Sequence, residues 1–104
     1  MKRTYAKLKM SDQSISKKKF GFKDVIKIYG THVTVFVHKS LDSRYKGEWC
    51  VSHYSTGCLL GPNYFKTPTE AVKNIASSIE SRNKMFPFYQ EILTAKTKYG
   101  VINE

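Results

Sequence analysis

The stretch HVTVFVH, residues 32–38, alternates apolar and polar side chains at nearly every step. A period of two predicts a β-strand with one face in a core. One face carries Val33, Val35 and Val37, and the other carries His32, Thr34, Phe36 and His38. This strand sets the fold class, because the rest of the chain must cover its valine face.

Further strands are predicted on both sides of this stretch. Downstream, residues 48–54 (EWCVSHY) alternate in the same way, with Trp49, Val51 and His53 on one face and Glu48, Cys50, Ser52 and Tyr54 on the other. The turn Ser55-Thr56-Gly57 leads into a short returning strand at residues 58–60. Upstream, Val25 to Tyr29 reads as a short strand that turns at Gly30-Thr31.

Two helices are expected in the second half. Thr67-Pro68-Thr69-Glu70 has the form of a helix start, with a threonine cap, a proline at the first helical position and a glutamate three residues after the cap. The residues that then share one helical stripe are Ala71, Val72, Ile75, Ala76 and Ile79. A second, shorter helix is predicted from about Pro87 to Tyr99, ending at Gly100, with Phe88, Ile92, Leu93 and Tyr99 turned inward.

These elements predict an α+β fold in which an antiparallel sheet of three or four strands packs against one helix. The short C-terminal helix and a basic N-terminal arm complete the architecture. We expect residues 1–23 to form this arm, partly mobile, and residues 24–104 to form a single α+β domain.

The charge of the chain is large and unevenly spread. The formal net charge is +10, and residues 1–46 hold 12 basic and 3 acidic residues, whereas residues 47–104 hold 6 and 5. Such a field attracts polyanions, nucleic acid first among them. A surface that is charged only for solubility is the alternative. A membrane partner is not expected, since there is no long apolar run and no basic amphipathic helix with a wide apolar face.

The candidate nucleic-acid contacts form two clusters of cations. The first lies in the arm and the second between the two clearest strands, and Tyr54 is added as a stacking residue. They are Lys17, Lys18, Lys19 and Lys23, then Lys39, Arg44 and Lys46, then Tyr54. Lysines grip phosphates with little sequence selectivity, and Tyr45, Tyr54 and Phe36 offer stacking to single strands. The alternative is a solvated surface with the aromatic rings in the core.

The sequence contains no pattern typical of an enzyme, a metal site or a cofactor site. Cys50 and His53 have a ligand-like spacing, but strand alternation directs them to opposite faces, and Cys58 stands alone. Glu48, Cys50 and His53 fail as a nucleophilic set for the same reason. We therefore expect two free thiols, no metal, no cofactor and no catalysis.

Part of the chain resembles a known DNA-binding family. The residues are Gly47-Glu48-Trp49-Cys50-Val51, then Leu60-Gly61, then Phe65-Lys66-Thr67-Pro68-Thr69-Glu70-Ala71. Over about residues 32–80 they are similar to the AP2-type domain and the amino-terminal domains of phage and transposon integrases. This resemblance implies a three-stranded sheet braced by a helix, with duplex DNA as the partner. The strand at 48–54 departs from the family in having no arginine on its outward face.

The leading hypothesis is thus a small, non-catalytic nucleic-acid-binding module, accessory or regulatory, in a phage or mobile element. It would work in the cytoplasm, that of the bacterial host if a phage encodes it. The alternative is a phage-encoded inhibitor of a host defence complex, anti-CRISPR-like, that contacts a larger protein or ribonucleoprotein directly. Binding of nucleic acid by the purified protein would separate the two.

Overall fold

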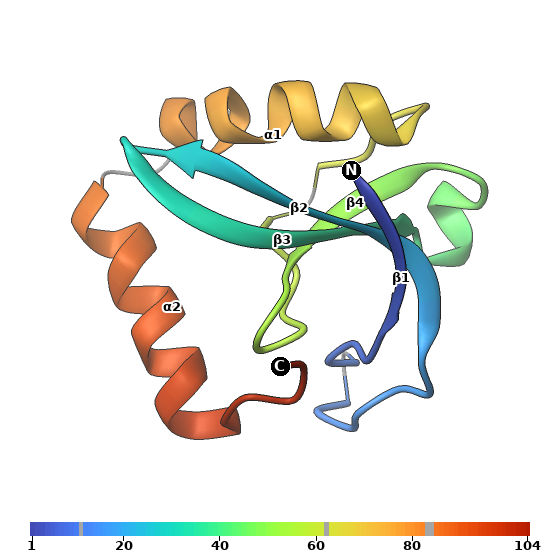
Figure 1. The fold of residues 1–104 in the computed structure, drawn as a ribbon, viewed down its shortest axis with the longest axis horizontal. Helices are drawn as coiled ribbons and strands as arrows, with labels where there is room; N and C mark the ends of the chain where they lie inside the picture. The colour runs from blue at the N-terminus through green and yellow to red at the C-terminus, as the bar shows by residue number, and fades with distance from the viewer. Residues whose placement is uncertain (11, 62, 83–84) are drawn as a thin grey trace.

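The computed structural model describes residues 1–10, 12–61, 63–82 and 85–104, apart from the side chains of residues 85–87 and 99. Its four strands form one antiparallel sheet in the order β1-β2-β3-β4. Figure 1 shows α1 lying across one face of this sheet and α2 beside one end of it. The elements are β1 (Lys2–Ala6), β2 (Lys19–Ile28), β3 (Thr31–Lys39), the short 3₁₀ helix η1 (Ser43–Tyr45), β4 (Trp49–His53), α1 (Pro68–Arg82) and α2 (Met85–Tyr99).

The main core lies between the sheet and α1. The alternation of β3 turns Val33, Val35 and Val37 toward the helix, whose Ala71, Ile75 and Ile79 are almost fully buried against them. The helix starts as expected, because the Thr67 hydroxyl accepts the Glu70 N–H at 3.1 Å. The α+β prediction and the packing of one helix on the sheet are confirmed.

The turn between β2 and β3 ties both helices to the sheet. Tyr29 and Gly30 both have positive φ, which matches a tight type I′ hairpin between the paired residues Ile28 and Thr31. The Tyr29 N–H donates to Glu80 of α1 at 2.8 Å. The Tyr89 hydroxyl of α2 donates to the Ile28 carbonyl at 2.7 Å. The turn therefore sits one residue earlier than the sequence suggested.

The C-terminal helix α2 is as long as α1, with 15 residues each. Phe88 and Ile92 pack against the main core as expected. Leu93 was expected to point inward, but it is 58% exposed, because α2 packs at one end of the sheet and buries only a narrow stripe. The side chain of Tyr99 lies outside the described residues.

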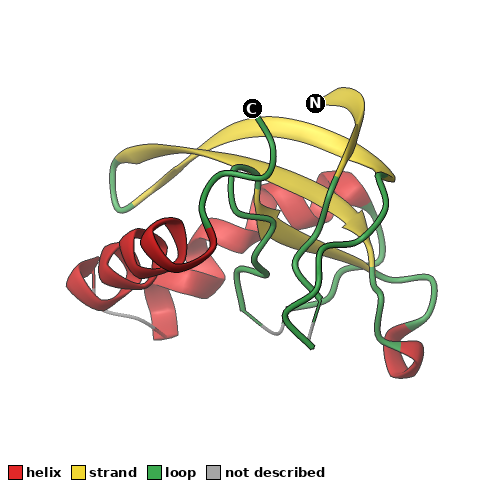
Figure 2. Cartoon of the chain, turned by 90° about the horizontal axis from the view of Figure 1, so that it is seen from below, coloured by secondary structure: helices red, strands yellow, loops and turns green. Residues whose placement is uncertain are grey.

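The second face of the sheet is partly covered by three segments far apart in sequence, seen below the sheet in Figure 1. They are the chain after β1, the hairpin after β4 and the C-terminal tail. Asn103 joins all three, through hydrogen bonds with Lys7 and Tyr54. Leu8 and Phe36, each 1% exposed, form a second small core there. Figure 2 shows the loops gathered against this side.

The expected N-terminal arm is corrected at the level of secondary structure. Residues 2–6 form edge strand β1, which pairs antiparallel with residues 19–23 of β2. The sheet thus extends 23 residues further toward the N-terminus than the sequence suggested, because the charged residues of β1 and β2 hide the alternation that marks a strand. The expected strand at 58–60 is reduced to an isolated bridge, Ser52 to Leu59.

Candidate nucleic-acid interface

A set of lysines occupies the face of β1 and β2 that points away from the helices. Alternation along β2 puts Lys19, Lys23 and Lys27 on this face, about 13 Å apart from one to the next. Lys2 of β1 is the direct cross-strand partner of Lys23. We call these four residues the lysine face. None of them pairs with a carboxylate within the described part of the chain.

Repulsion between the lysines of this face lowers the stability of the sheet. Like charges directly opposite each other on one face of a sheet destabilise it. The other positions of this face on β1 to β4 contain no acid that would compensate, since they are Thr4, Ala6, Gly21, Val25, His32, Thr34, Phe36, His38, Cys50 and Ser52. Lys23 lies over the Tyr54 ring, with its Nζ 4.3 Å from the ring centroid. A bound polyanion would relieve the repulsion.

The sequence-predicted residues are distributed over three places. Lys19 and Lys23 lie on the lysine face, where Lys23 contacts the Tyr54 ring. Lys17 and Lys18 are exposed in the segment before β2. The remaining three, Lys39, Arg44 and Lys46, lie at or after the end of β3.

The cations at or after the end of β3 differ in whether a carboxylate neutralises their charge. The Arg44 guanidinium binds Asp42 at 2.7 Å, and its hydrogen bonds hold the pKa of that carboxyl below its ordinary value. Part of the Arg44 charge is therefore neutralised locally. Lys39 instead faces the Trp49 ring at 5.9 Å and shares a groove with Lys19. The structure thus brings one member of each predicted cluster together.

Three aromatic rings that line that groove belong to a longer series of ring contacts. Tyr5, Phe20, Phe22 and Trp49 follow one another across the sheet, with centroid separations of 5.6, 5.5 and 5.8 Å. We call them the aromatic row. The groove encloses about 510 Å³ and is lined by Phe20, Phe22 and Trp49 together with Arg3, Lys19 and Lys39. It combines ring surfaces with three cations.

The three stacking residues predicted from the sequence differ in how much of each ring is exposed. Phe36 is 1% exposed and is covered by the N-terminal segment, so its ring has no face available to a ligand. Tyr45 stacks on Tyr64 with centroids 3.9 Å apart. Tyr54 is half-buried under Lys23, and its hydroxyl donates to the Glu104 carbonyl at 3.3 Å. The expectation for Phe36 was wrong, because the sheet face that it occupies is not open there.

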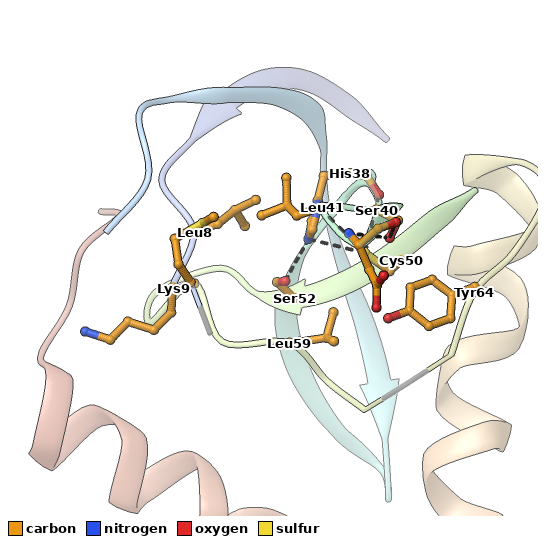
Figure 3. Close-up of a pocket in the computed structure, with 12 residues that line it drawn as sticks. Leu8, Lys9, His38, Ser40, Leu41, Cys50, Ser52, Leu59 and Tyr64 are labelled. Atoms are coloured by element: carbon orange, nitrogen blue, oxygen red, sulfur yellow. Dashed lines mark hydrogen bonds between the residues drawn. The ribbon is translucent and has the colours of Figure 1, made fainter. Parts of the chain in front are cut away.

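A second cavity, of about 360 Å³, lies over β4 and is shown in Figure 3. Within it, His38 Nδ1 lies 2.9 Å from the Lys39 carbonyl, which can only accept, so Nδ1 carries the proton. His38 Nε2 then accepts the Ser52 hydroxyl at 2.8 Å. Burial lowers the pKa of His38 and so favours the neutral ring. Both ring nitrogens of His38 therefore have hydrogen-bond partners within the protein.

Cys50 and Ser52, expected to face outward, are each 2% exposed because Leu8 and the neighbouring loops cover them. Burial raises the pKa of the Cys50 thiol to about 12, so the thiol is protonated at neutral pH. His53 lies on the opposite face, with Nδ1 2.9 Å from the Thr56 hydroxyl. Among the described residues, no three His, Cys, Asp or Glu side chains gather to hold a metal ion. The absence of catalysis remains a prediction.

Lys2, Arg3 and Lys27 were not among the contacts predicted from the sequence, and Tyr5 and Phe20 were not among the predicted stacking residues. The signal that could have found them is the spacing of lysines at 19, 23 and 27, which shares one face if the strand begins at residue 19. The stretch KFGFK, residues 19–23, alternates in the same register. Trp49 was assigned to the helix face correctly, but its contact with Phe22 depends on the pairing of distant strands.

In the part of the chain that the structure describes, no helix has the length and apolar character needed to cross a membrane. Comparisons with protein-family models, with curated proteins and with solved structures found no match to this chain.

Proposed function

We propose that this protein binds nucleic acid and holds its phosphates with the lysine face. The observation that carries the proposal is the set of four lysines on one sheet face, two of them directly paired across strands and none paired with an acid among the described residues. The like charges of such a cluster repel each other across the strands, whereas a phosphate backbone would attract all of them. We also propose that the protein acts in the cytoplasm.

The net charge of +10 supports the same partner, because it speeds the encounter with a polyanion over a long range. Lysine contacts give position without sequence information. We therefore propose weakly selective binding. In a regulatory or accessory role, this affinity would hold the protein on the nucleic acid of a larger complex.

The test is fluorescence anisotropy of labelled oligonucleotides at two salt concentrations. In the face variant, Lys2, Lys23 and Lys27 are changed to Gln. Each lost phosphate contact lowers the slope of log affinity against log salt by about 0.7–0.9. We expect the slope of the face variant to fall by about 2–3, with affinity lower by more than tenfold.

A matched control removes the same charge elsewhere. Lys66, Lys73 and Lys96 are exposed, on or beside the two helices, and their change to Gln leaves the same net charge as in the face variant. The proposal predicts that this control keeps most of the affinity. Equal losses in both variants would reduce the effect to overall charge. No binding by the unaltered protein at near-physiological salt would overturn the proposal.

A further inference from the structure

The outer end of the aromatic row is exposed. Tyr5 is 62% exposed and Phe20 is 44% exposed, although both are large rings in contact with each other. Single exposed apolar residues are ordinary, but a contiguous exposed patch rimmed by polar groups marks an interaction site. The exposed pair of rings is such a patch, since Phe20 lines a groove together with Arg3, Lys19 and Lys39.

The inner half of the row is fixed by the core. Phe22 and Trp49 are half-buried and pack against the main core between the sheet and α1. The outer half, Tyr5 and Phe20, is a direct cross-strand pair at the edge of the sheet. The rings are inclined at 63°, 68° and 45° to their neighbours and are not stacked flat. A planar ligand can therefore lie on an exposed ring face while its edge meets the next ring.

We infer that the aromatic row, with the three cations of its groove, is a base-stacking site for single-stranded nucleic acid, DNA or RNA. Every base has a flat π surface, and stacking on protein rings requires that the base has left the duplex stack. Duplex DNA exposes only base edges in its grooves and offers no such surface. The inference rests on the proposed function and adds to it the strand form.

Charge complementarity specifies the occupant further. The cations that line the groove have no carboxylate partner among the described residues, and Lys39 lies 5.9 Å from the Trp49 ring. Apolar rings alone would suit a hydrophobic protein surface, but the cations favour a ligand with flat apolar faces and regular negative charge. A single strand has both. Lys19 belongs to the lysine face as well as to the groove, so one strand can contact both surfaces around β1.

Trp49 supplies a direct reporter, because it is the only tryptophan of the chain. We would titrate the protein with a 12-nucleotide oligo(dT), an oligo(rU), a duplex of equal length and an abasic oligodeoxyribose phosphate of equal charge. Stacking on protein rings strengthens binding by about 5- to 150-fold per base. We expect the base-containing strands to bind at least about fivefold more tightly than the abasic strand and to quench Trp49 fluorescence. The comparison of oligo(dT) with oligo(rU), which differ in the sugar and in the thymine methyl group, tells whether a DNA or an RNA strand is bound more tightly.

The matching variants are Phe20→Leu and Tyr5→Leu, which keep an apolar side chain on the strand and remove the ring. Each should lower affinity for oligo(dT) by about fivefold or more and leave affinity for the abasic strand unchanged. Leu93→Ala is the control, an exposed apolar residue on α2 away from the groove. Urea unfolding of each variant verifies that the fold is retained.

The outcomes separate the two proposals. If abasic and base-containing strands bind equally, or if the duplex binds best, the stacking inference is wrong and phosphate binding by the lysine face stands. If nothing binds at near-physiological salt, both fail. If oligo(dT) is preferred but Phe20→Leu and Tyr5→Leu bind it normally, the bases are held elsewhere and the assignment to this row is overturned.

Discussion

Asn103 lies near the end of the chain, yet it closes the second face of the sheet. Its Oδ1 accepts the Lys7 N–H at 2.9 Å, and its Nδ2 donates to the carbonyls of Lys7 and Tyr54 at 2.8 and 2.7 Å. The residue is only 9% exposed. A typical internal hydrogen bond contributes about 0.5–1.5 kcal/mol net, so Asn103→Ala should cost about 2–4 kcal/mol. That is a large part of the ~5–15 kcal/mol that stabilises a domain.

Urea unfolding measures this loss directly. With a slope of about 1–3 kcal/mol per molar urea, the midpoint should fall by about 1–3 M. Asn103→Asp should cost at least as much, because it keeps the acceptor for Lys7 but sets a carboxylate against two carbonyl oxygens. Gln90→Ala removes an exposed amide from α2 and should change stability by less than about 0.5 kcal/mol. A loss below about 0.5 kcal/mol for Asn103→Ala would refute the idea that this side chain joins the three segments.

Three further predictions follow from buried positions. A Cβ at Gly21 would lie 2.3 Å from the Val37 carbonyl and 2.6 Å from the Phe36 ring, so Gly21→Ala should destabilise by about 1–3 kcal/mol, seen as a lower melting temperature. Burial lowers the pKa of His38 below its ordinary value of 6.5, so the contribution of the neutral ring to folding stability is complete above pH 6.5 and is lost as the pH falls below it. When unfolding is measured from pH 7 to 5.5, the loss of stability should be smaller in His38→Gln. Of the two free thiols, Cys58 should react with a thiol reagent at neutral pH well before Cys50, whose pKa is about 12; equal rates would show that the cover over Cys50 opens.

The edge strand β1 contributes residues to both proposed surfaces, the lysine face and the aromatic row. Strand alternation sends Lys2 to the helix-free side and Arg3 and Tyr5 to the side of the aromatic row. Edge strands have one unpaired side, and charged residues there discourage pairing with other chains. These charges can both prevent strand pairing with other chains and bind nucleic acid. The Gln variants at the lysine face distinguish the two roles, since only a loss of the binding role changes the affinity for an added oligonucleotide.

The parts of the fold that have local signals could be predicted from the amino-acid sequence. The alternation of HVTVFVH gave β3 and its valine face, and the threonine cap with Pro68 placed the start of α1 at the residue observed. The stripe of Ala71, Ile75 and Ile79 predicted which side of the helix is buried. Each of these features depends on neighbours within a turn or a strand, so it can be predicted without knowing the rest of the chain.

The place of the basic N-terminal segment in the sheet depends on contacts between distant parts of the chain. Lys2 to Ala6 have no clean alternation, and they form a strand because residues 19–23 offer hydrogen-bond partners across a connection of 12 residues. The same pairing set Lys2 opposite Lys23 and Tyr5 against Phe20. The lysine face and the aromatic row therefore both arise from register between strands, which is a relation between distant residues. A single sequence carries that relation only weakly, because shifting the register by one residue exchanges every side chain between the two faces.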